Sequence, residues 1–334
     1  MANNDKDSKK GEATSGLDRV LVLEIARVTE AAAIAAARLR GRGDEKAADK
    51  AAVDAMRREL GKVAIRGRVV IGEGEMDEAP MLFIGEEVGT GEGPEVDIAV
   101  DPLEGTTICA KYMPNSLAVL AISERGGLLN APDMYMDKIA IGPDYPDGVV
   151  DLDRSPGDNI RALAAAKGVP VTGITACILD RPRHAEIIKA VRAAGAGVQL
   201  IPDGDIAGVI WTTNPGHTGI DIYLGSGGAP EGVLAAAALR CIGGQMQGRL
   251  KPSNEAETRR ALTMGVTDIK KKYSLRELAS GDVIFSATGI TGGSLLDGVH
   301  FRGDFAETET VVLRSKTGTV RRIKTTFRMI GHKP

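Results

Sequence analysis

Cysteine and aromatic residues are scarce in this sequence of 334 residues. Its three cysteines, at positions 109, 177 and 241, lie far apart, which excludes a disulfide framework and a cysteine-rich zinc site. Free cysteines are typical of a reducing compartment, so we expect the protein to be cytoplasmic. Aromatic residues make up 3%, too few for the stacking surfaces that bind single-stranded nucleic acid.

An excess of positive charge and long apolar runs are also absent. Lys and Arg number 42 against 45 Asp and Glu, a formal net charge of −3, whereas nucleic-acid-binding chains are usually basic. The nearest candidate for a membrane span, residues 31–37, is flanked by Glu30 and Arg38 and is far shorter than the roughly 20 residues required. We therefore expect neither nucleic acid nor a membrane as a partner.

The hydrophobic pattern predicts a layered α/β protein behind a flexible N-terminal tail, residues 1–16. Apolar residues at helical spacing predict helices at 17–39, 45–60 (with Asp44 as N-cap), 184–194 and 231–241. Short apolar runs predict strands at 69–71, 81–84, 96–100, 117–122, 138–141, 174–179, 198–201, 220–224, 283–286, 309–313 and 319–325. We expect two domains, a metal-binding α+β domain over 17–160 and an α/β substrate domain over 161–334.

Acidic residues occupy positions where an apolar or small residue is expected. Asp101 ends the apolar run 96–100, and a proline stops the strand, so that Glu104 can turn back beside it. Ligands of α/β proteins gather at the carboxyl ends of strands. Gly105 and Thr106 then open a segment that, as a helix, would offer free N–H groups to an anion. The motif suits a divalent cation beside a phosphate, although it also makes ordinary capped turns.

Three further acids have similar settings. Asp49 lies on the apolar stripe of its predicted helix and needs a partner there, although the edge of that helix could equally reach the surface. Glu73 follows a strand between two glycines, which admit a close ligand; an acidic loop is the alternative. Glu231 follows the Gly-rich segment 225–228 at a helix start, where the helix dipole alone also favours an acid. Together the five acids favour metal-assisted phosphate hydrolysis with Mg²⁺ ions.

Basic and polar residues complement these acids. Arg181 and Arg183 follow a predicted strand and could bind phosphate through paired hydrogen bonds, or simply lie on the surface. Asp203 and Asp205 follow the next strand and could accept hydrogen bonds from sugar hydroxyls, or cap a helix. Tyr135 could contact substrate or pack in the interior. A Walker A motif, a G-x-G-x-x-G turn after a strand and an H-E-x-x-H motif are all missing, which disfavours other chemistries.

Long blocks of the sequence resemble a known family. From about residue 17 to 323 the chain contains, in order, GRGDEKAAD, VVIGEGEMDEAPMLFIGEEVG, VDIAVDPLEGT, LNAPDMYMDK, RPRH, IPDGD, GGAPEG and VIFSATGIT. Together they resemble class II fructose-1,6-bisphosphatase of the GlpX type, in the lithium-sensitive, Mg²⁺-dependent phosphatase superfamily with its Asp-Pro-x-(Asp/Glu)-Gly-Thr signature. The resemblance implies a layered α/β/α/β/α sugar-phosphatase fold with two sheet-containing halves and the active site between them.

The resemblance also implies an activity and a set of site residues. The expected reaction removes the 1-phosphate of fructose 1,6-bisphosphate with Mg²⁺ or Mn²⁺ in a homo-oligomer, dimer or tetramer. The implied metal ligands are Asp49, Glu73, Asp101, Glu104 and Glu231, and the implied catalytic residues are Asp101, Glu104 and Thr106. The implied substrate-binding residues are Glu104, Gly105, Thr106, Tyr135, Arg181, Pro182, Arg183, Asp203, Gly204, Asp205 and Gly228.

The sequence departs from the family pattern at two positions and leaves two alternatives open. Glu45 stands where the family usually has lysine, which removes a cation close to the predicted metal helix, and Arg181 stands where lysine is common. Sedoheptulose 1,7-bisphosphate is an alternative or additional substrate that these motifs do not distinguish. A sugar-phosphate sensor without catalytic activity is the alternative from another class, and the complete set of five acids argues against it.

Overall fold

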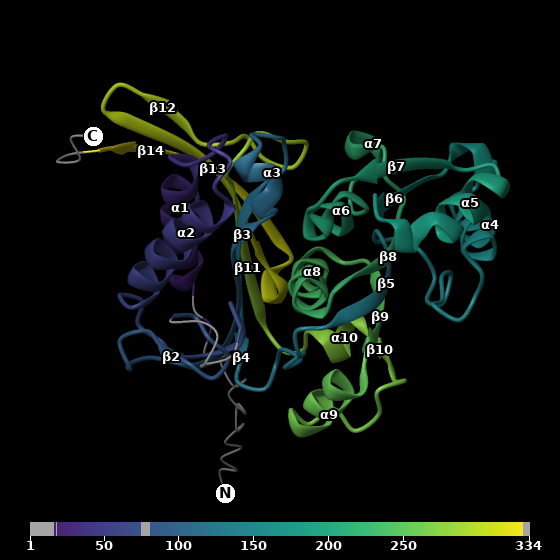
Figure 1. Cartoon of the computed structure of the whole chain (residues 1–334), viewed down its shortest axis with the longest axis horizontal. Helices are drawn as coiled ribbons and strands as arrows, with labels where there is room; N and C mark the ends of the chain where they lie inside the picture. The colour runs from purple at the N-terminus through teal and green to yellow at the C-terminus, as the bar shows by residue number, and fades with distance from the viewer. Residues whose placement is uncertain (1–16, 18, 75–80, 330–334) are drawn as a thin grey trace, which may run out of the picture.

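The computed structural model describes residue 17 and residues 19–74 and 81–329. The predicted tail, residues 1–16, therefore lies outside the described residues. Two β-sheets form the frame, with helices on their outer faces and between them (Figure 1). Among the described residues, no helix combines the length and the apolar character needed to cross a membrane.

The first sheet has eight strands in the order β12-β13-β11-β4-β3-β1-β2, with β14 also paired to β13. Only β1 and β3 run parallel among its described pairs, and the others are antiparallel. Its strands are β1 (Arg66–Ile71), β2 (Glu87–Val88), β3 (Glu95–Glu104), β4 (Leu117–Glu124), β11 (Val283–Gly289), β12 (His300–Arg302), β13 (Phe305–Arg314) and β14 (Thr319–Arg328).

The second sheet has six strands in the order β10-β9-β5-β8-β6-β7. Strand β6 runs parallel to β7 and β8, whereas β5 is antiparallel to β8 and β9. The strands are β5 (Tyr135–Ile141), β6 (Thr175–Leu179), β7 (Gly197–Ile201), β8 (Ile222–Gly228), β9 (Gln245–Lys251) and β10 (Lys272–Ser274).

Helices complete five layers. Helices α1 (Leu21–Ala37) and α2 (Glu45–Leu60) cover the outer face of the first sheet, α6 (Asp205–Trp211) and α8 (Ala229–Ile242) lie between the sheets, and α4 (Pro156–Lys167) and α5 (Ala185–Ala193) cover the second sheet (Figure 1). The short helices are α3 (Thr106–Ala110), α7 (Pro215–Thr218), α9 (Glu255–Thr263) and α10 (Leu275–Leu278), with 3₁₀ turns η1 (Val171–Gly173), η2 (Pro182–His184) and η3 (Ser315–Thr317). The expected α/β/α/β/α layering is confirmed.

The central helix α8 is apolar on all sides because it is enclosed by both sheets. Its residues 232–239 are Gly, Val, Leu and alanine, and all are buried. A helix that is apolar all round is typical of a core position, and small side chains let two sheets approach it closely. Its N-terminus opens at the carboxyl end of β8, where the site acids lie.

Most predicted elements are confirmed, and one strand is wrong. Helix 45–60 has the predicted bounds, and the Asp44 carboxylate accepts a hydrogen bond from the Ala47 amide at 2.9 Å. The strand predicted at 81–84 is instead a turn, and β2 begins six residues later. Leu82 adopts φ 55°, a left-handed conformation that an extended strand does not use, while its carbonyl accepts from the Glu73 amide.

The sheets do not follow the predicted boundary at residue 160. Strand β5 precedes that residue yet lies in the second sheet, and β11 to β14 return from the last part of the chain to the first sheet. Because strand pairing joins segments that are distant in sequence, one boundary along the chain cannot separate the strands of the two sheets. The division into an α+β and an α/β domain stays a prediction, whereas the sheets divide the chain into three stretches.

Candidate metal centre and active site

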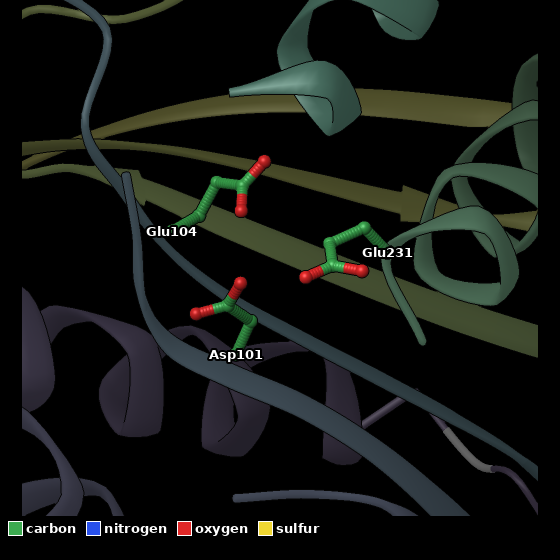
Figure 2. Close-up of side chains that lie close together, drawn as sticks. All are labelled: Asp101, Glu104 and Glu231. Atoms are coloured by element: carbon green, nitrogen blue, oxygen red, sulfur yellow. The ribbon is translucent and has the colours of Figure 1, made fainter. Parts of the chain in front are cut away.

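Three carboxylates meet at the end of β3 and the start of α8. One oxygen from each of Asp101, Glu104 and Glu231 lies within 4.8 Å of the others (Figure 2). Residues three apart on a regular strand point to opposite faces. Here the pairing of β3 with β4 shifts register between Asp101 and Glu104, and this irregularity lets both carboxylates face Glu231.

All five predicted metal ligands line one cavity of about 300 Å³. Asp49 lines it from α2, and Glu73 lines it from the loop after β1. Asp49 is half-buried, as its position on the apolar stripe predicts. Acids from four separate segments therefore converge at one place between the two sheets.

Burial and mutual repulsion make these acids hard to ionise without a counter-charge. Burial, with the charges of Asp49, Asp101 and Glu231, raises the pKa of Glu73 to about 8. Burial likewise raises the pKa of Asp101, and burial with the neighbouring Asp101 charge raises that of Glu104 well above its ordinary value. Acids of this kind are stabilised as carboxylates by a bound cation.

Glu231 provides a direct test of whether the site fits a metal ion. Its Oε2 atom is buried and accepts no hydrogen bond within the described part of the chain. A Cβ atom at Gly228 would lie 1.8 Å from that oxygen, so only glycine admits the carboxylate there. An unsatisfied buried carboxylate oxygen beside two further carboxylates is the ligand set that Mg²⁺ or Mn²⁺ prefers.

The turn after β3 carries the predicted Gly105 and Thr106 into the same cavity. Gly105 has φ 78°, and a Cβ there would lie 2.7 Å from the Ile108 side chain, so glycine is required. Helix α3 follows, but it has only five residues, so its dipole adds little to anion binding. Thr106 is half-buried and lines the same cavity as the acids.

The predicted substrate residues outside this turn form a second group. The Arg183 guanidinium donates from Nε and Nη2 to the Ser226 carbonyl, at 3.0 and 2.8 Å, and lies 4.6 Å from the Tyr135 ring centre. Arg181 Nη2 is 4.0 Å from Asp203, and of these residues Asp203 lines the cavity. Pro182 opens turn η2 and holds both arginines at the end of β6.

Asp205 lies deeper than its predicted contact with sugar hydroxyls requires. It is 5% exposed, and its carboxylate is paired with the buried Lys138 and accepts a hydrogen bond from the Tyr223 hydroxyl at 3.3 Å. Gly204, at φ 85°, caps α6 just before it. Neither Asp205 nor Gly204 lines the cavity.

Sequence reasoning missed Asp133 and Lys138. Asp133 lines the cavity from the segment before β5. Lys138 is 1% exposed, in the middle of the apolar strand β5. A lysine inside a run that otherwise reads as a buried strand was the available signal, because a buried ammonium group requires a partner.

The departure at Glu45 also has a structural setting. Glu45 is the first residue of α2 and is exposed. Its negative charge contributes, after burial and the nearby Asp205, to raising the pKa of Asp203. The position therefore influences Asp203, at the cavity wall, electrostatically.

Comparisons with known proteins identify relatives of this chain. A family model described as bacterial fructose-1,6-bisphosphatase, glpX-encoded, matches residues 19–327. The chain is 47% identical over 319 residues to the D-fructose 1,6-bisphosphatase class 2/sedoheptulose 1,7-bisphosphatase of Prochlorococcus marinus (strain NATL1A), covering 91% of this chain and 95% of that protein. It is 48% identical over 343 residues to the protein of the same description from Synechococcus sp. (strain JA-3-3Ab), covering 95% and 98%.

A third relative carries only one activity in its name. The chain is 49% identical over 320 residues to fructose-1,6-bisphosphatase 1 class 2 of Escherichia coli (strain K12), covering 92% of this chain and 94% of that protein. The family match spans nearly the whole described chain, and each relative is covered almost completely. The chain belongs to the family of bacterial fructose-1,6-bisphosphatases encoded by glpX.

Proposed function

We propose that this protein hydrolyses the 1-phosphate of fructose 1,6-bisphosphate, giving fructose 6-phosphate and phosphate. The observation that carries the proposal is the convergence of five acids on one cavity beside Gly105 and Thr106. The names of the relatives supply the substrate.

Asp101, Glu104 and Glu231 are the residues that would hold a divalent metal ion, with Glu73 and Asp49 completing the ligand set. Such an ion, when bound, lowers the pKa of water and withdraws charge from phosphoryl oxygens. The buried, unsatisfied Oε2 of Glu231 supports this assignment. Both Mg²⁺ and Mn²⁺ suit carboxylate ligands.

The turn after β3 would act on the phosphoryl group that is transferred. Backbone N–H groups of Gly105 and Thr106 would hydrogen-bond the phosphoryl oxygens, and the Thr106 hydroxyl would orient the attacking water. Donors fixed by a glycine turn lose little entropy when charge develops in the transition state. Glu104, a metal ligand in this proposal, would also hold the attacking water in place.

The second group of residues would bind the rest of the sugar bisphosphate. Arg183, held by the Ser226 carbonyl and Tyr135, would bind the 6-phosphate, and Arg181 would add a second cation. Asp203, at the cavity wall, would accept hydrogen bonds from sugar hydroxyls. Binding both ends of the substrate fixes the 1-phosphate against the acids.

Sedoheptulose 1,7-bisphosphate is a second candidate substrate because two relatives carry both activities in their names. That sugar is one carbon longer, so its distal phosphate would reach the arginines from a shifted position. The experiment measures phosphate release from both bisphosphates by the full-length protein with Mg²⁺ and with Mn²⁺. Release from neither, together with a binding isotherm for either sugar, would favour the sensor and overturn the proposal.

Assembly and location are part of the same proposal. We expect a cytoplasmic homo-oligomer, dimer or tetramer, acting in sugar phosphate metabolism of the gluconeogenic or Calvin type. Light scattering of the purified full-length protein gives its mass against the 35.0 kDa of one chain. A single-chain mass at micromolar concentration would contradict the oligomer.

A further inference from the structure

The buried lysine Lys138 links two parts of the acidic site that are far apart in sequence. Its ammonium group is paired with the Asp205 carboxylate and donates to the Gly228 carbonyl at 2.8 Å. Lys138 and Asp205 are 1% and 5% exposed. An ion pair so deeply buried is unfavourable to desolvate unless further hydrogen bonds support it; here the Gly228 carbonyl supports the lysine and the Tyr223 hydroxyl supports the carboxylate.

The backbone around this ion pair is shaped to admit it. Gly227 lies next to the pair, and a Cβ atom there would be 2.2 Å from Asp205 Oδ2 and 3.0 Å from Lys138 Nζ. Strand β5 pairs with β8 so that Lys138 lies opposite Gly225, and the side chain then reaches along β8 to Gly228. A larger residue at position 227 would separate the two charges.

Each partner of Lys138 is linked by short contacts to one of the predicted metal ligands. Gly228 is the residue before α8, and Glu231 lies in the first turn of that helix with its carboxylate against Gly228. On the other side, the residue after Asp205 is Ile206, whose amide donates to Glu104 Oε1 at 3.3 Å. Lys138 therefore connects the supports of Glu104 and Glu231 without lining the cavity itself.

We propose that Lys138 is a positioning residue of the metal centre. Through Asp205 and Gly228 it fixes the positions of Glu104 and Glu231. It also neutralises Asp205, so that this acid does not join the cluster. The inference rests on the proposed metal centre, but not on the identity of the sugar substrate. Residues that orient metal ligands typically change metal affinity about 10–100-fold when they are replaced.

A second ion pair at the other end of β8, with a buried carboxylate and a half-buried lysine, provides a control. Lys167, at the end of α4, pairs with Asp221, which is 4% exposed and immediately precedes β8. This pair supports the second sheet near its outer helices and contacts none of the five acids. Lys167→Met therefore reports the effect of leaving a buried carboxylate without its lysine partner, away from the site.

The test measures Mn²⁺ binding by titration calorimetry to the metal-free full-length protein, without substrate, together with thermal unfolding. For Lys138→Met we expect Mn²⁺ binding at least about tenfold weaker. Turnover should fall, with the KM for the bisphosphate within about twofold of wild type. Lys167→Met should lower the unfolding temperature and leave the isotherm unchanged. A wild-type isotherm for Lys138→Met with a lowered unfolding temperature would overturn the inference, because a purely structural pair predicts that result.

Two more variants keep the test decisive if Lys138→Met does not fold. Asp205→Asn retains the bond from Lys138 to Gly228 but weakens the link to Glu104, so Mn²⁺ binding should weaken by a smaller factor. The neutral pair Lys138→Met/Asp205→Asn should recover thermal stability without recovering Mn²⁺ affinity, and recovery of both would overturn the inference. Wild-type protein that binds Mn²⁺ but releases no phosphate would refute the proposed reaction alone, whereas wild type that binds no Mn²⁺ would refute the metal centre and this inference together.

Discussion

Asp101 and Glu104, three residues apart on β3, turn their carboxylates to the same side because the β3–β4 ladder shifts register between them. A regular strand would have separated the two groups across the sheet. Because of this irregularity, both carboxylates lie close to Glu231, which follows some 130 positions later in the first turn of α8. The cluster of three carboxylates therefore depends on a local irregularity of strand pairing, which the proline after Asp101 favours.

Replacing Asp101 by asparagine should abolish turnover while keeping the fold. The amide has nearly the same shape but loses the charge that a divalent cation requires, so we expect kcat to fall at least about 10²-fold. Steady-state phosphate release at saturating Mg²⁺ measures this. The control is Asp54→Asn, an exposed acid of α2 paired with Lys50, which should retain wild-type turnover. Normal turnover in Asp101→Asn would refute its assignment.

Metal-free protein should lose stability as the pH rises. In the folded state the pKa of Glu73 is about 8, above its ordinary value of 4.5, so folding favours the protonated form. The stabilisation is complete below pH 4.5 and is lost as the pH rises toward 8, by at most about 1.4 kcal/mol per pH unit.

Thermal unfolding in chelator at several pH values between 5 and 8 measures this loss. Saturating Mg²⁺ should reverse the trend, because the ion replaces the protons. Glu73→Gln should flatten the metal-free profile. An unfolding temperature that is constant over this range in the metal-free wild type would contradict the prediction.

Substitution of Gly105 by alanine should impair activity more than stability. Gly105 has φ 78°, and the new Cβ would lie 2.7 Å from Ile108, which displaces the turn carrying Thr106. Gly126→Ala is a matched control, since Gly126 has φ 79° but nothing within 4 Å of the added Cβ. Both should lose about 1–2 kcal/mol of folding free energy from the left-handed conformation. Only Gly105→Ala should lose turnover, and equal activities would contradict our account of the turn.

Arg183→Lys should weaken binding of the bisphosphate and spare the chemistry at the 1-phosphate. Lysine cannot keep the paired bonds to the Ser226 carbonyl or the planar contact with Tyr135, so the group facing the 6-phosphate is no longer fixed. We expect KM to rise about tenfold with kcat little changed. Arg161→Lys, an exposed arginine paired with Asp158, serves as the control. An unchanged KM would remove Arg183 from the substrate site.

Local sequence signals determined much of the fold. Helix 45–60 could be predicted because apolar spacing and an N-cap act within a few residues, and Asp44 does cap it. The strand expected at 81–84 failed because Leu82 adopts a left-handed turn to meet the Glu73 amide, a contact that an apolar run does not reveal. Strand β9 was missed, although its alternating burial is clear once its partners β5 and β10 are known.

The sequence alone singled out five acids as predicted metal ligands, each at a position where burial would be unfavourable without a partner, and all five line one cavity. Only the tertiary structure decided how they are held. Strands β11 to β14 pair within the first sheet, and Lys138 contacts both Asp205 and Gly228. Both arrangements join residues that are dozens of positions apart in the sequence. Strand pairing and buried ion pairs depend on which segments meet in space, and residue type and spacing along the chain do not encode that directly.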